Sequence, residues 1–147
     1  MSSFQIIVGS MLGGTEYVAE ACQETLSSLN HQTQLHFSPE FEQIPIKDQI
    51  WLICTSTHGA GDYPDNLLPF VNKLRSNTQD LSPIKFFVIG VGDSSYDTFC
   101  QAAKNITTEL KSKGCKELIS LKTLDMQLDL DPEDEAQAWI LANKDRL

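Results

Sequence analysis

The chain has 147 residues and a formal net charge of −9, from 20 acidic and 11 basic side chains. This length predicts one domain, residues 1–147, large enough to bury roughly 70% of the surface of the unfolded chain. The negative charge argues against binding to nucleic acid or to anionic membranes, whose phosphates it repels. It favours a basic protein partner, although solubility alone is the safer explanation of it.

The first residues and the cysteines indicate a reduced, cytoplasmic protein. Residues 1–4 contain no basic targeting segment, and no apolar stretch approaches the ~20 residues of a membrane span. The four cysteines lack CxxC spacing and show no metal-like pairing with the three histidines. Cys22 and Cys54 fall on apolar faces, so we expect them to be buried thiols.

Strand and helix patterns alternate along the whole chain. Alternation of this kind forces parallel strands joined by right-handed crossovers. The predicted fold class is α/β, a three-layer sandwich with a five-stranded parallel sheet of order 2-1-3-4-5. Strands are expected at 4–8, 33–37, 50–54, 86–91 and 117–124, and helices at 15–29, at 67–75, around 102–110 and from 132 onward.

The first loop, residues 9–15, joins the first strand to the first helix. Its backbone N–H groups and the helix N-terminus can face one anion, and Ser10 and Thr15 add hydroxyl groups. No Lys or Arg precedes Lys47, so the loop is not a nucleotide-triphosphate P-loop, which needs GK[ST]. The loop suits a single terminal phosphate held without a cation. The alternative is a glycine-rich turn that only reverses the chain.

The central loop, residues 56–66, is the most informative segment. It follows the apolar run 50–54, which predicts a strand buried on both faces. Gly59, Gly61 and Pro64, with hydroxyl and amide side chains, place polar groups at the carboxyl end of that strand, where ligands bind in open α/β sheets. The loop has no Lys or Arg. We therefore expect it to present neutral polar groups to a flat ring.

The third loop, residues 92–99, follows another buried strand. Gly90 and Gly92 match the start of a GxGxxG dinucleotide motif, but a serine takes the place of the third glycine, so this signal is weak. Tyr96 can stack on a planar ring, or it can be an ordinary half-buried tyrosine. Phe99 is expected to pack in the core. Together the three loops suit a ring that carries a phosphate tail.

These loops resemble those of short-chain flavodoxins, most closely the MioC type. The chain is also similar to the FMN domains of diflavin reductases such as sulfite reductase and cytochrome P450 reductase. The resemblance implies a flavodoxin-like fold that binds FMN, with His58 over one face of the flavin ring and Tyr96 stacked on the other. It implies these cofactor-binding residues: Ser10, Met11, Leu12, Gly13, Gly14, Thr15, Ser56, Thr57, His58, Gly59, Ala60, Gly61, Gly92, Asp93, Tyr96 and Phe99.

Two residues depart from the family pattern. Leu12 stands where phosphate loops usually carry a hydroxyl residue, which predicts a lower affinity for FMN. His58 stands where many relatives carry Trp or Tyr, and an imidazole covers less of the ring.

The expected function is that of an electron carrier, not an enzyme, whose protein part tunes the flavin. Gly59 lacks a Cβ, so its peptide can reorient to offer a hydrogen-bond partner to the flavin. The resemblance implies a flavodoxin or ferredoxin NADP reductase as electron donor, and reductive or radical enzymes as acceptors. The alternative function is a small FMN-dependent NAD(P)H or quinone reductase. A flavin-free interaction protein is a further alternative, against which the intact ring loops argue.

The expected partner surface is basic. Asp62, Asp65, Asp93 and Asp97 lie in or beside the ring loops, so an acidic docking face is predicted. If these acids serve only solubility, the remaining docking surface would be apolar and would lie around Tyr63 and Pro64.

Overall fold

The computed structural model describes residues 2–10 and 14–147 of the chain. Every strand pairing in this part of the chain is parallel. The order across the sheet is β2-β1-β3-β4-β5, with β6 also paired to β4, so the predicted order 2-1-3-4-5 is confirmed. The strands are β1 (Ser3–Gly9), β2 (Gln32–His36), β3 (Ile50–Thr55), β4 (Lys85–Gly92), β5 (Lys116–Glu117) and β6 (Lys122–Asp125).

The edge strand expected at 117–124 is two short strands. Phe86 of β4 pairs with Glu117 of β5, whereas Ile89 of β4 pairs with Lys122 of β6. Three steps along β4 are thus matched by five along the edge, and the two extra residues bulge out of the ladder. Ile119 in this bulge is buried, so the break in pairing does not interrupt the apolar pattern on which the prediction depended.

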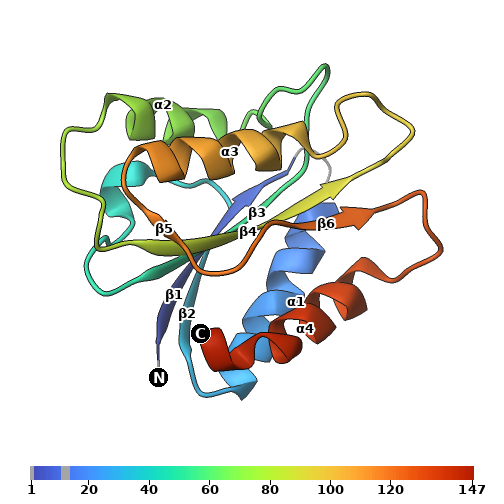
Figure 1. Ribbon diagram of the computed structural model, residues 1–147, viewed down its shortest axis with the longest axis horizontal. Coiled ribbons are helices and arrows are strands. Elements are labelled where there is room, and N and C mark those ends of the chain that lie inside the picture. Colours follow the sequence, from blue (N-terminus) through green and yellow to red (C-terminus); the bar gives the residue numbers. More distant parts are fainter. Residues whose placement is uncertain (1, 11–13) are drawn as a thin grey trace.

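The helices form the two outer layers of the three-layer sandwich. In Figure 1, α1 and α4 cover one face of the sheet, and α2 and α3 cover the other. The helices are α1 (Gly14–Ser28), α2 (Leu68–Ser76), α3 (Gln101–Ser112) and α4 (Pro132–Ala142), with short 3-10 turns at η1 (Phe41–Gln43) and η2 (Lys144–Arg146). No helix in the described part of the chain is long and apolar enough to cross a membrane.

The central strands contribute side chains to two separate apolar cores. In β3, Trp51 and Ile53 pack on the α2–α3 side, while Leu52 and Cys54 pack on the α1–α4 side. Since both faces are covered, the strand has no polar side to alternate with, and its sequence is a continuous apolar run. All four cysteines are buried and free, including Cys22 and Cys54 as expected. These two cores fix the strands whose carboxyl ends carry the three loops.

Candidate functional site

Two cavities open at the carboxyl edge of the sheet, between the three loops. One has a volume of about 440 Å³ and the other about 520 Å³. Both are lined by Ser56, Thr57, Gly59 and Val91, so they adjoin each other, and we call the two cavities together the trough. The fold therefore brings the three predicted loops to a single site.

The larger cavity contains the described residues of the first loop. Ser10, Gly14 and Thr15 line it, and α1 begins at Gly14, so a helix N-terminus borders this end of the trough. Met11, Leu12 and Gly13, which were also predicted to bind the cofactor, lie outside the described residues.

Asn66, which the sequence analysis did not assign to the site, supports the first loop from the end of the central loop. Its Oδ1 accepts a hydrogen bond from the Ser10 N–H at 2.9 Å. Its Nδ2 donates to the carbonyl oxygens of Val8 at 2.8 Å and Phe37 at 2.9 Å. One amide side chain thus joins the end of β1, the first loop and the segment after β2. In the sequence, Asn66 is marked only by its position as an amide side chain at the end of the central loop.

The central loop forms a tight hairpin over residues 58–62. His58 and Asp62 exchange two backbone hydrogen bonds, each 2.8 Å long. Gly59 (φ 54°) and Gly61 (φ 109°) adopt the left-handed conformation that glycine tolerates best. His58 and Gly59 line the trough, whereas Ala60 at the exposed tip and Gly61 lie beyond its lining.

Thr57 attaches the start of this hairpin to α3. The residue before α3, Cys100, has φ 52° and gives the helix no side-chain cap. The Thr57 hydroxyl oxygen instead accepts a hydrogen bond from the Ala102 N–H at 3.1 Å. A trough residue therefore satisfies one of the unpaired N–H groups at the start of a helix.

The third loop is bonded to the end of β6 and to the turn that follows it. Asp93 accepts hydrogen bonds from the Ser95 N–H at 2.8 Å and from Gln127 Nε2 at 3.0 Å. Asp125 accepts a bond from the Ser94 N–H at 3.0 Å. These hydrogen bonds favour the charged carboxylates, and they hold the pKa values of Asp93 and Asp125 below the usual range.

Two aromatic residues of the third loop line the smaller cavity, together with Gly92 and Asp93. The Tyr96 side chain is 68% exposed, so its ring is open to a ligand. Phe99 is half-buried and packs against the α2–α3 core, as expected, while it also lines the cavity. Cys100 lies at the same wall, and burial raises the pKa of its thiol to about 11.

Several lining residues come from segments that carried no functional signal in the sequence. They belong to ordinary helical or strand patterns or to the turn after β6, and only the fold brings them to the trough. One of them is acidic: Glu133, whose hydrogen bond with Asp131 raises the pKa of its carboxyl group. The residues concerned are Tyr17, Val18, Val91, Met126, Pro132 and Glu133.

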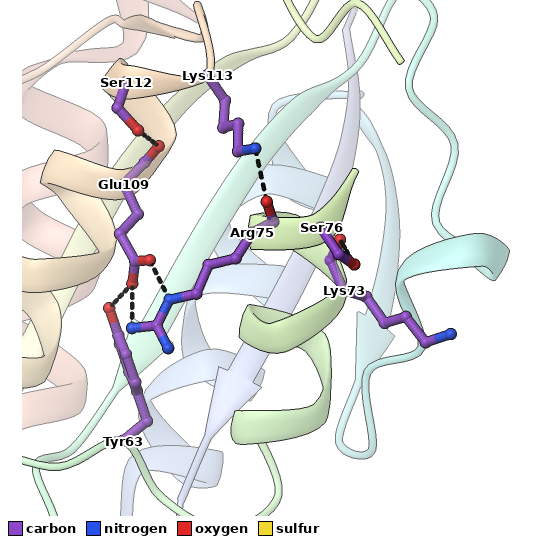
Figure 2. A network of polar contacts seen from close by, with 7 residues as sticks. All are labelled: Tyr63, Lys73, Arg75, Ser76, Glu109, Ser112 and Lys113. Atoms are coloured by element: carbon purple, nitrogen blue, oxygen red, sulfur yellow. Dashed lines mark hydrogen bonds and ion pairs between the residues drawn. The ribbon is translucent and has the colours of Figure 1, made fainter. Parts of the chain in front are cut away.

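The alternative docking surface around Tyr63 and Pro64 is not formed by these two side chains themselves. Both residues are buried, and Tyr63 is only 7% exposed. Its ring belongs to the core under α2 and α3, and its hydroxyl group donates a hydrogen bond to Glu109 of α3 (Figure 2). By contrast, Asp62, Asp65 and Asp97 are not buried, and no Lys or Arg lines the described part of the trough.

Comparison with known proteins defines the class of this fold and site. The sequence profile of the Flavodoxin family matches residues 6–139. The chain is 43% identical over 143 residues to the protein MioC of Escherichia coli (strain K12), covering 95% of each. It superposes on a cysteine-to-serine mutant of flavodoxin from Pseudomonas aeruginosa with a TM-score of 0.90, at 29% identity, covering 99% of this chain and 98% of that one. The chain therefore belongs to the flavodoxin family.

A longer relative shows the same unit as part of a larger protein. The chain is 31% identical over 136 residues to the sulfite reductase [NADPH] flavoprotein alpha-component of Shewanella sp. (strain MR-7). That match spans 91% of this chain but 22% of the relative. The resemblance to MioC proteins and to diflavin reductases is thus confirmed.

Proposed function

We propose that the chain binds one FMN in the trough and carries electrons between a reductase and acceptor enzymes. The observation that carries this proposal is that the two cavities share four lining residues, one cavity bordering the N-terminus of α1 and the other the exposed ring of Tyr96. The cavities have the size of small-ligand sites, which are about 300–1,000 Å³. Membership in the flavodoxin family supports FMN as the ligand.

The residues at the two ends of the trough fit the two ends of FMN. Ser10, Gly14 and Thr15 would hold the phosphate, because a helix N-terminus offers N–H groups and partial positive charge to an anion without a basic side chain. Tyr96 would stack on the isoalloxazine, and His58 lines the trough where it could cover the other face. Gly59 and Gly92 line the cavity in which the edge of the ring would lie.

FMN supplies the reversible uptake of one or two electrons, and the protein sets how readily this happens. Carboxylates at Asp62, Asp65 and Asp97 lie in the loops at the ring end and disfavour added negative charge there. They also provide an acidic face for a basic partner surface. A flavodoxin or ferredoxin NADP reductase is the proposed donor, and reductive or radical enzymes are the proposed acceptors.

A titration that compares FMN with riboflavin tests this proposal. Flavin fluorescence is followed as the flavin-free chain is added, and we expect FMN to bind much more tightly because riboflavin lacks the phosphate. Equal affinities would remove the phosphate site at the end of α1. Oxidation of NADPH by the FMN-loaded chain without a reductase would instead support the alternative of an NAD(P)H or quinone reductase.

A further inference from the structure

A cluster of three side chains lies behind the central loop, outside the trough. Tyr63 follows the 58–62 hairpin directly, and its hydroxyl donates to Glu109 Oε2 (Figure 2). Arg75 of α2 donates to the same carboxylate twice, from Nε at 2.5 Å and from Nη2 at 3.2 Å. The Arg75 guanidinium also lies over the Tyr63 ring, 5.8 Å from its centroid. Tyr63 is thus attached to both helices of this layer.

The chemistry of this cluster makes a firm attachment. A hydrogen bond to a carboxylate is stronger than one between neutral groups, and the bidentate arginine fixes the position of that carboxylate. Burial, and then the bond to Glu109, raise the pKa of the Tyr63 hydroxyl, so it remains a protonated donor at neutral pH. Lys113, at the end of α3, donates to the backbone carbonyl of Arg75 at 2.9 Å, which joins the two helices once more.

The hairpin is therefore fixed to α3 at both of its ends. Before the hairpin, Thr57 accepts from Ala102 in the first turn of α3. After it, Tyr63 donates to Glu109, two turns further along the same helix. Only residues 58–62 lie between these two attachments, and His58 and Gly59 are the ones that line the trough.

We propose that Tyr63, acting through Glu109 and Arg75, is a positioning residue that sets the hairpin against the flavin ring and so tunes its two one-electron potentials. This inference rests on the proposed FMN site. With FMN bound, reduction would change the hydrogen bonding that the edge of the ring requires, and the peptide at Gly59, which lines the trough and which glycine leaves free to reorient, would be the group to respond. The free energy of that adjustment depends on how firmly the ends of the hairpin are held.

The test uses Tyr63→Phe, which keeps the buried ring and removes only the hydroxyl group. Its first readout is amide hydrogen exchange in the flavin-free full chain. We expect exchange at His58 and Asp62 to accelerate about tenfold, the effect of losing one hydrogen bond to a charged group, while exchange in β3 and β4 stays unchanged.

The second readout is a spectroelectrochemical titration of the FMN-loaded variant. We expect the ratio of the equilibrium constants for the first and the second one-electron reduction to fall about tenfold. The difference between the two reduction potentials then changes by about 59 mV. Lys113→Met is the matched control, because it removes a bond between α2 and α3 without touching the loop. We expect this control to leave both readouts as in the wild type.

Two results would overturn the proposal, and a third would separate it from the proposed FMN site. Wild-type exchange and potentials in Tyr63→Phe would overturn it. Equal acceleration across β3 and β4 would also overturn it, because the hydroxyl would then serve only global stability. If the wild-type chain does not bind FMN, the proposed function fails, whereas accelerated exchange confined to the hairpin would still establish the attachment.

Discussion

The central loop and the third loop border the same end of the trough, but they are built differently. The central loop is attached to helices and to β1, through Thr57, Tyr63 and Asn66. The start of the third loop is attached to the end of β6 and to the turn after it, through Asp125 and Asp93, and its last residue, Phe99, packs against the α2–α3 core. The central loop is thus bonded to helices and to a central strand, whereas the third loop is bonded chiefly to the edge of the sheet and the turn beside it.

Two tyrosines illustrate the difference. Tyr63 in the central loop is 7% exposed, and Tyr96 in the third loop is 68% exposed. A buried, bonded tyrosine contributes to the folded state before any ligand arrives, whereas an exposed tyrosine has most of its contacts still to gain. Changes in the central loop should therefore weaken folding and FMN binding together, and changes in the third loop should weaken binding alone.

The largest expected effect is on FMN binding by Tyr96→Ala. Loss of a stacked ring should cost about 1–3 kcal/mol, or roughly a 5- to 160-fold loss of affinity. Since Tyr96 is exposed, the thermal midpoint of the flavin-free chain should not change. A fluorescence titration measures the affinity, with Tyr96→Phe as a control that keeps the ring. Unchanged affinity and quenching would make His58 the stacking residue.

Asn66→Ala tests the attachment of the central loop to β1 and to the first loop. The substitution removes the amide that bonds the Ser10 N–H and the carbonyl oxygens of Val8 and Phe37. The free energy of unfolding should therefore fall by about 2 kcal/mol. FMN affinity should fall as well, and riboflavin affinity should fall less, because the first loop would hold the phosphate. Urea unfolding of the flavin-free chain measures the first effect.

The control for Asn66→Ala is Asn77→Ala, an asparagine just after α2 whose side chain donates to the Gln79 carbonyl oxygen, away from the trough. It should change neither stability nor affinity by a comparable amount. Full stability in Asn66→Ala would show that water replaces the amide, and that the central loop is no better anchored than the third loop.

Thr57→Val should have a smaller effect, confined to one helix end. Loss of a helix cap costs about 1 kcal/mol, and the residue that precedes α3 provides no side-chain cap. Thr57→Ser keeps the hydroxyl group and should remain close to the wild type. The free energy of unfolding of the flavin-free variants measures this difference, and identical values for Val and Ser would exclude the Thr57 hydroxyl as a cap.

The sequence predicted the strand order and the position of the three loops, because both follow from apolar runs and from where these runs stop. It did not predict the attachments. Thr57 and Ala102 are 45 residues apart, and Tyr63 and Glu109 are 46 apart, so only the folded sheet brings them together. Tyr63 lies in a polar loop in which nothing indicates a buried side chain, and its carboxylate partner lies on a helix with no functional motif.

The split of the last strand was missed for a related reason. Leu118 and Ile119 continue the apolar pattern of the edge, and nothing in their order marks the two extra residues. The break exists only relative to β4, whose register changes between Phe86 and Ile89. Register is a property of two strands, so a pattern along one of them does not reveal it.

The smallest expected effect is on the rate of association with a partner. It tests whether the acids of the central loop guide the partner through their position or only through the net charge of the chain. Asp62→Asn should slow association with a flavodoxin reductase about twofold at low salt and weaken the dependence of the rate on ionic strength, because steering between opposite charges is screened beyond ~10 Å at 0.1 M salt. Asp145→Asn makes the same change in net charge at an exposed site in η2, beside the chain end that Figure 1 places far from the loops. Stopped-flow reduction across a salt series compares the two. An equal dependence of the rate on ionic strength in the two variants would mean that only net charge matters. The central loop would then hold the flavin without guiding the partner to it.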